Sequence, residues 1–240
     1  VVTITYRARL ATQCATALTN QARLFVNGAE AGQAAAPVAL KSALKCDLYL
    51  PAVLRPDVVE PAPTLANGSF DQGRVAWSEL INNVAGRLIV SNGETPYTAQ
   101  SPEWFTWLGG APNEETKGRQ DLTTALPTRY PIYVQFYYLL ESAESDCTRD
   151  RAEVRVGKSG EVLQKVWELG LCGANKTDGA WRLVAPVNLS LETLKGQLVT
   201  VEFAATLDGA RNSNFLVDTV SFCTTSDGIS GIARCPTVVA

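Results

Sequence analysis

The sequence predicts an all-β protein whose main domain is an antiparallel β-sandwich of the jelly-roll type. Two stretches near the C-terminus show the clearest strand patterns. Apolar and polar residues alternate over 198–207, as in a half-buried strand, and 215–222 is apolar on both parities, as in a central strand. About eight or nine such segments lie between residues 65 and 225, at the spacing of a sandwich or jelly roll. No stretch has the 3.6-residue period of an amphipathic helix.

Residues 1–50 are expected to form a small β unit of their own. Alternation predicts strands over 2–10 and 22–26, and Asn27-Gly28 after the second strand is a strong hairpin turn. A small-residue segment, 29–37, then leads to a third expected strand over 38–44. Roughly three or four strands are too few to close a sandwich, so this unit is incomplete by itself.

Two segments of this unit are similar to a known repeat. ITYRARL, which begins at Ile4, and LTNQARL, which begins at Leu18, resemble the second half of the immunoglobulin-like repeat of bacterial surface proteins, where VTYTVTV precedes LTNTATV. The resemblance implies that the missing strands come from an upstream segment of a longer protein or from another chain. The alternative is a small extension that packs on the main domain.

The remaining boundaries follow from composition and cysteines. Residues 51–64 carry four prolines and are expected to be an extended linker between the small unit and the main domain, 65–225. Residues 226–240 are expected to be a C-terminal tail that a disulfide tethers. The chain begins at Val1 and contains no Met, which indicates a processed or excised piece.

The six cysteines predict three disulfides. Their number is even and none has C-x-x-C spacing, so zinc or redox sites are less favoured than disulfides in an oxidising, extracellular compartment. Several pairings are open, and pairing of neighbours in the sequence is favoured: Cys14–Cys46, Cys147–Cys172 and Cys223–Cys235.

Composition excludes several classes of function. The formal net charge is −3 and no long basic run occurs, so nucleic acid is not an expected partner. No apolar run reaches the ~18–20 residues of a membrane span. Histidine is absent, which removes Ser-His-Asp and Cys-His catalysis and the usual zinc sites. We therefore expect no enzymatic activity.

Four motifs of the main domain are similar to a known group of modules. They are NGSFDQG with a following Trp, WLGG, CTRDRAEVRV with LCGANKTDGAW, and GQLVTVEFAATLDGARNSNFLVDTVSF. They resemble the jelly-roll modules of bacterial secreted and surface proteins that are related to MAM-like, galactose-binding-like and carbohydrate-binding modules. The resemblance covers nearly all of 65–225 and implies the fold rather than a ligand, because this fold hosts many functions.

One carboxylate stands out in the last strand. Asp218 is expected to share a core-facing side with Leu216, Val220 and Phe222. A bare carboxylate there would cost several kcal/mol or more, so it needs a cation or a set of hydrogen-bond donors.

The resemblance implies a structural calcium ion at this point. In such modules calcium ties the opening segment to the last strand, and the matching residues here are Asn67, Asp71 and Asp218. Thr219 departs from the pattern, because a second Asp is usual at that position. The alternative is that Asp218 accepts backbone hydrogen bonds or pairs with Arg74.

Exposed aromatic rings are candidate glycan contacts. Tyr133 and Tyr137 share the outer parity of one strand, and Trp104 lies in a loop-rich region, so the three are expected to form a platform on which a sugar ring stacks. The alternative is that most aromatic rings fill the core, as expected from their parity for Trp107, Trp167 and Trp181. Acidic pairs that a glycosidase would need are expected to be solvated surface, among them Glu144, Asp150 and Glu153.

Together these features predict a non-enzymatic structural or adhesive module of an extracellular or cell-surface protein. Its expected partners are other copies or neighbouring protein segments, which would pair with the incomplete β unit of residues 1–50. The alternative is a carbohydrate-binding accessory module of a secreted hydrolase, with glycans as partners.

Overall fold

The structure is a computed structural model that describes residues 2–7, 17–26, 29–39, 63–82, 86–128, 131–189 and 191–224. The chain divides into two compact units, Val1–Val59 and Glu60–Ala240. The expected linker residues 51–62 and the expected tail 226–240 lie outside the described residues.

The N-terminal unit is an antiparallel sheet with the strand order β1-β2-β3. Its strands are β1 (Val2–Arg7), β2 (Ala17–Val26) and β3 (Ala29–Ala39). The prediction for the third strand was wrong, because β3 begins directly after Asn27-Gly28 instead of at Val38. Only two residues separate the two strands, and Val26 of β2 pairs with Ala29 of β3.

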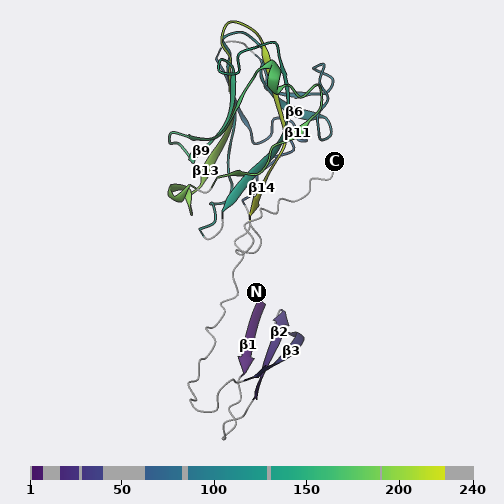
Figure 1. The fold of residues 1–240 in the computed structure, drawn as a ribbon, viewed down its shortest axis with the longest axis vertical. Helices are drawn as coiled ribbons and strands as arrows, with labels where there is room; N and C mark the ends of the chain where they lie inside the picture. The colour runs from purple at the N-terminus through teal and green to yellow at the C-terminus, as the bar shows by residue number, and fades with distance from the viewer. Residues whose placement is uncertain are drawn as a thin grey trace. The chain divides into compact units, whose positions relative to one another are not determined.

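The second unit is an antiparallel β-sandwich, as predicted (Figure 1). Its first sheet has the order β10-β9-β13-β7-β4, and its second sheet has the order β11-β8-β14-β6-β5, with β12 also paired to β8. The last two strands therefore lie in the middle of the two sheets. The elements are β4 (Ser78–Ile81), β5 (Ile89–Ser91), β6 (Trp104–Gly109), β7 (Glu115–Asp121), β8 (Ile132–Ser142), β9 (Arg151–Lys158), β10 (Gln164–Gly170), η1 (Gly173–Asn175), β11 (Arg182–Leu183), β12 (Val187–Asn188), η2 (Glu192–Leu194), β13 (Val199–Thr206) and β14 (Ser213–Thr224).

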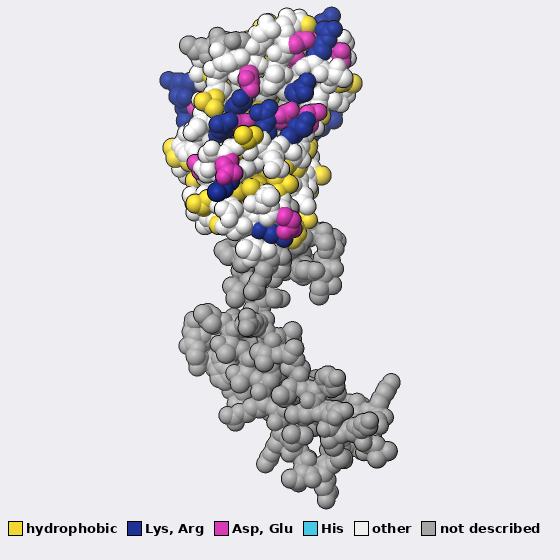
Figure 2. Space-filling model, turned by 90° about the vertical axis from the view of Figure 1, so that its left-hand side faces the viewer, with side chains coloured by type: hydrophobic (Ala, Val, Ile, Leu, Met, Phe, Trp, Pro, Cys, Tyr) yellow, Lys and Arg dark blue, Asp and Glu magenta, His cyan; other side chains and the backbone are white. Residues whose placement is uncertain are grey.

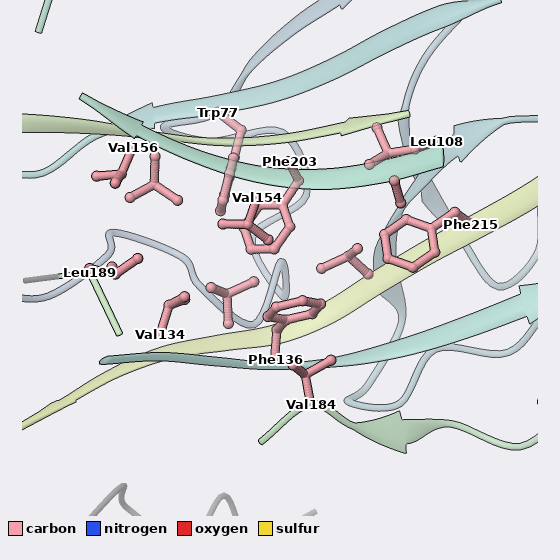
Figure 3. Close-up of a cluster of buried hydrophobic side chains, with 14 of the residues drawn as sticks. Trp77, Leu108, Val134, Phe136, Val154, Val156, Val184, Leu189, Phe203 and Phe215 are labelled. Carbon is pink, nitrogen blue, oxygen red and sulfur yellow. The ribbon is translucent and has the colours of Figure 1, made fainter. Parts of the chain in front are cut away.

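The main core fills the space between the two sheets (Figure 3). Phe136 of β8 packs edge-on against Phe203 of β13, with ring centroids 5.0 Å apart. The alternation expected for β8 is present, since Val134 and Phe136 are buried in this core while Tyr133 and Tyr137 are half-buried on the other side. Each buried side chain of this size contributes about 1.5–3 kcal/mol.

A second, smaller cluster lies on the outer side of the second sheet. It consists of Val90, Phe105, Leu139 and Leu216, with Trp107 and Trp181 packed against it. Residues 92–103, which connect β5 to β6 and which we call the strap, contribute Tyr97 and Ala99. The indole nitrogen of Trp181 donates a hydrogen bond to the strap at the Thr98 carbonyl, 2.8 Å away. Trp107 and Trp181 therefore pack outside the sandwich core, contrary to expectation.

A β-bulge divides β14 and corrects the predicted face of Asp218. The register to β8 shifts between Asp218 and Ser221, and Thr219 has a φ of +52°. Before the bulge, Leu216 and Asp218 point outward; after it, Val220 and Phe222 point into the main core. One extra residue reverses the parity of a strand, so Asp218 does not share its face with Val220 or Phe222.

The outer face of the first sheet carries ion pairs, and Figure 2 shows Lys and Arg beside Asp and Glu on one side of this unit. Glu202 is fully buried and lies between Arg119 and Arg155, with a distance of 3.0 Å to the latter. Arg155 also contacts Glu153 at 2.6 Å. Each of these two buried carboxylates therefore has a cationic partner, which offsets the cost of its burial.

No helix in the described part of the chain is both long and apolar enough to cross a membrane.

Candidate functional site

The opening segment of the main domain is a loop that Asn67 organises. Its amide nitrogen donates to the carbonyl oxygens of Gly73 and Val75, at 2.8 and 3.1 Å, and its Oδ1 accepts a hydrogen bond from the Gln72 amide at 3.0 Å. Asn67 itself has a φ of +66°, which Asn tolerates better than most residues. The side chain expected to bind calcium thus makes hydrogen bonds within its own loop.

This loop contacts the last strand, β14, at Gly68. The Val220 amide donates to the Gly68 carbonyl at 2.8 Å. A Cβ atom at position 68 would lie 2.2 Å from the Val220 carbonyl oxygen, closer than any side chain can approach. The glycine of the NGSF motif is therefore required by the close contact between two segments that are far apart in the sequence.

Asp218 is fully buried and satisfied by donors from the strap. Its Oδ2 accepts from the amides of Gln100 and Ser101, at 2.8 and 2.9 Å, and its Oδ1 accepts from the Thr219 amide. Burial nevertheless raises the pKa of this carboxyl from 3.8 to about 6, against the opposing effect of these hydrogen bonds. Arg74, the other partner considered for it, pairs with Glu79.

Oxygen atoms converge on the Ser101 hydroxyl in the same place. Its Oγ lies 3.0 Å from the Ser69 carbonyl oxygen, 3.3 Å from Oδ1 of Asp71 and 3.0 Å from Oδ1 of Asp218. One hydroxyl has a single proton and can satisfy only one of these acceptors. Within the described residues no group of three or more His, Cys, Asp or Glu is placed to hold a metal. Calcium also takes carbonyl and hydroxyl oxygens, so the types of oxygen in this mixed cluster are among those that calcium accepts.

The three aromatic residues expected to form a glycan platform do not lie together. Tyr133 and Tyr137 are half-buried on the outer side of the second sheet, with Gln135 between them. Trp104 is half-buried against the main core, on the same strand parity as Leu108. The platform is thus reduced to the two tyrosines, because β6 turns Trp104 to the opposite side of the same sheet.

A groove lies at the end of the sandwich where β8 ends and β14 begins. It has a volume of about 440 Å³. Its lining residues come from the end of β8, from the segment after η1 and from the start of β14: Leu140, Glu141, Ser142, Ala143, Lys176, Asp178, Asn212 and Asn214.

The groove presents polar groups with unused hydrogen-bonding capacity. Among the described residues, the side chains of Lys176, Asp178 and Asn212 have no hydrogen-bond or ion-pair partner. Glu141 accepts one hydrogen bond, from the Tyr97 hydroxyl at 3.1 Å, and Oδ1 of Asn214 accepts one from the Trp107 indole at 3.1 Å. Donors and acceptors therefore face the same space, beside aromatic rings.

A buried polar network supports the floor of the groove. Ser142 and Ser213 are joined through their hydroxyls at 2.8 Å, and Ser213 donates to Oδ2 of Asp150 at 2.6 Å. The other carboxylate oxygen of Asp150 accepts from the Asp208 amide at 2.8 Å. Because every member is hydrogen-bonded, the network fixes the chain segments that surround the groove.

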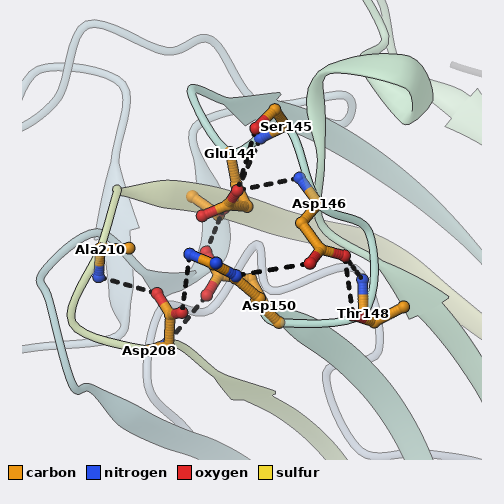
Figure 4. A network of polar contacts seen from close by, with 9 residues as sticks. Glu144, Ser145, Asp146, Thr148, Asp150, Asp208 and Ala210 are labelled. Atoms are coloured by element: carbon orange, nitrogen blue, oxygen red, sulfur yellow. Dashed lines mark hydrogen bonds and ion pairs between the residues drawn. The ribbon is translucent and has the colours of Figure 1, made fainter.

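The adjacent loops carry acidic side chains that hydrogen bonds hold in place (Figure 4). Oε1 of Glu144 accepts from the amides of Ser145 and Asp146, at 2.7 and 2.9 Å, and Arg149 lies between Asp146 and Asp208. The prediction that the acidic clusters are solvated surface was wrong for four carboxylates, since burial is nearly complete at Glu114, Glu144, Asp150 and Glu153.

The Cys147–Cys172 disulfide joins the segment between β8 and β9 to the segment that follows β10. Its Cα atoms are 4.8 Å apart. A Cβ atom at Gly170 would lie 2.2 Å from the Cys147 carbonyl oxygen, so only glycine fits beside this bridge. Cys223 is also disulfide-bonded. The expected pairings of Cys14, Cys46 and Cys235 fall outside the described residues.

Sequence patterns did not reveal the groove. Lys176, Asp178 and Asn212 lie in loops without periodicity, and only the fold brings these loops to the end of β8. Only composition could have indicated these loops. The segments 173–179 and 208–214 are rich in Asn, Asp and Gly, and each lies within one of the four motifs that resemble the known modules.

No protein-family model and no curated protein matches the sequence. Several solved structures resemble the chain. A carbohydrate-binding module, TmCBM61, in complex with β-1,4-galactotriose has 11% identity and a TM-score of 0.48, covering 68% of this chain and 99% of that one. The K1 cleaved adhesin domain of Lys-gingipain from Porphyromonas gingivalis W83 has 12% identity and a TM-score of 0.46. The match covers 70% of this chain and 99% of that one.

A family 11 carbohydrate-binding module from Clostridium thermocellum has 11% identity and a TM-score of 0.41, covering 69% of this chain and 96% of that one. The assignment as a β-sandwich rests on the strand order and the core described above.

Proposed function

We propose that this protein is a non-catalytic, extracellular adhesive module that binds glycans in the groove at the end of its sandwich. The observation that supports this proposal is the set of unpaired donors and acceptors that line the groove. Sugar hydroxyls donate and accept hydrogen bonds at once, so they pair with amide, carboxylate and ammonium groups together. The volume of about 440 Å³ is in the usual range of small-ligand sites.

A panel of immobilised polysaccharides tests this function directly. We expect the full chain to bind at least one neutral polysaccharide, and the double variant Asp178→Ala/Asn212→Ala to lose about tenfold or more in affinity, because each lost hydrogen bond in a ligand site costs about 0.5–1.5 kcal/mol. Glu161→Ala/Gln164→Ala, at a separate groove between the β9–β10 turn and η2, is the matched control. Failure to bind any glycan, or equal binding by both double variants, would contradict the proposal.

We further propose calcium as a structural ion held by the Ser69 carbonyl, Asp71, Ser101 and Asp218. The support is that Oγ of Ser101 lies 3.0–3.3 Å from an oxygen atom of each of the other three residues, so that four oxygens lie close together. The ion would supply positive charge that neutralises the two carboxylates and ties the opening segment to the strap and β14. Added Ca²⁺ at neutral pH is expected to raise the melting temperature of the wild type but not of Asp218→Asn, and an equal rise in both would argue against the site.

Extracellular placement is part of the proposal. The Cys147–Cys172 disulfide supports it, because such bonds persist in oxidising compartments.

A second candidate function, assembly with other copies, is favoured by the N-terminal sheet. Among its described strands, β1 and β3 each pair on one side only, with β2. Open strand edges can accept a strand from another chain. A concentration-dependent rise in mass that a deletion of residues 1–50 abolishes would support assembly through this sheet, and a concentration-independent monomer would exclude it.

A further inference from the structure

Two groove residues face each other across a strand pair. Glu141 of β8 and Asn214 of β14 are directly opposite in the antiparallel register, and both line the groove. Side chains in such positions have Cβ atoms about 4.5–5.5 Å apart. Their polar ends are therefore within reach of two neighbouring atoms of one ligand.

Trp107 sets the orientation of the Asn214 amide. An indole nitrogen can only donate, and that of Trp107 donates to Oδ1 of Asn214 at 3.1 Å. The amide cannot rotate by half a turn without placing two donors against each other. Since Asn214 has no other side-chain hydrogen bond to a described residue, its Nδ2 group is left to donate into the groove.

Tyr97 fixes the orientation of the Glu141 carboxylate in the same manner. Its hydroxyl donates to Oε2 at 3.1 Å, and its ring packs edge-on against Trp107 with centroids 5.5 Å apart. Burial is the larger cause and the neighbouring Glu141 the smaller cause of a rise in the pKa of Tyr97 to about 12. The hydroxyl therefore keeps its proton at neutral pH. Oε1 of Glu141 then remains as an acceptor.

We propose that Glu141 and Asn214 recognise a vicinal diol of a sugar, and that Tyr97 and Trp107 are positioning residues for this pair. One hydroxyl accepts from Nδ2 of Asn214, and the hydroxyl on the adjacent carbon donates to Oε1 of Glu141. The ligand class is a neutral glycan with two unsubstituted hydroxyls on neighbouring ring carbons. This inference rests on the proposed glycan-binding function and adds the chemical group that is recognised.

Periodate provides a test at the ligand, because it cleaves the carbon–carbon bond of vicinal diols and leaves isolated hydroxyls intact. The probes are immobilised galactan, mannan and xylan, each before and after periodate oxidation and borohydride reduction. The full chain is expected to bind at least one intact polymer. Oxidation is expected to weaken that binding about tenfold or more, because the two hydroxyls that Glu141 and Asn214 contact are then no longer held on neighbouring ring carbons. Unchanged binding after oxidation would overturn the diol inference and leave glycan binding standing, whereas no binding to any polymer would overturn both.

Two conservative variants test the positioning role. Trp107→Phe and Tyr97→Phe keep an aromatic ring and remove the donor, so each is expected to lower affinity for the intact polymer about three- to tenfold. Each is also expected to reduce the preference for intact over oxidised polymer, which a purely structural defect would not change. Trp167→Phe and Tyr138→Phe, at side chains that pack against the main core and line no part of the groove, are the matched controls. Retention of the full preference in both positioning variants would overturn the role given to Trp107 and Tyr97.

Discussion

Asp218 joins three segments of the main domain. Its carboxylate accepts hydrogen bonds from the strap and from Thr219, and Ser101 connects it to Ser69 and Asp71 in the opening loop. A buried carboxylate with a pKa of about 6 is partly protonated in mildly acidic solution. The stability of this junction therefore depends on pH, and the calcium ion that we propose would stabilise it further.

In the presence of a chelator, acid should stabilise this junction. The folded pKa of about 6 exceeds the ordinary value of 3.8, so the folded state binds the proton more tightly than the unfolded state. The resulting stability is fully present below pH ~4 and is lost as the pH rises through ~6, with a total of up to about 3 kcal/mol. Urea unfolding from pH 4 to 8 measures it. The difference between wild type and Asp218→Asn should change over this interval, and a constant difference would refute the raised pKa.

Strand β14 shows what a strand pattern can and cannot predict. Apolar residues on both parities correctly indicated a central strand. The bulge at Thr219 has no such signature, because the contacts that stabilise it come from the strap and from the opening loop, more than 100 residues earlier in the chain. The need of Asp218 for partners could be predicted from its apolar surroundings, but its outward orientation could not.

The close contact between the opening loop and β14 predicts that a substitution at Gly68 destabilises the protein. Gly68→Ala would place a methyl group against the Val220 carbonyl, where neither backbone can yield without losing the hydrogen bond between them. We expect a loss of about 2 kcal/mol or more in the free energy of unfolding. Gly93→Ala is the matched control, because no atom lies within 4 Å of its new methyl group. Chemical denaturation measures the free energy of unfolding of both variants. Equal values for Gly68→Ala and Gly93→Ala would be incompatible with the close contact.

The two functions that we propose belong to separate units of the chain. The groove is built at one end of the sandwich by loops that a disulfide and a buried polar network hold, while open strand edges belong to the N-terminal sheet. The sandwich itself could be predicted from strand periodicity. The groove could not, because its lining residues are distant in sequence and come together only through the pairing of β8 with β14.

A glycan that binds in the groove at the end of the sandwich, as we propose, would shield the backbone amides around it. Hydrogen–deuterium exchange of the full chain, with and without a saturating concentration of a bound neutral polysaccharide fragment, tests this proposal most directly. We predict added protection in the segments that line the groove, 140–143, 176–178 and 212–214. Protection confined to the strand segment that carries Tyr133 and Tyr137, with none at these three segments, would contradict it.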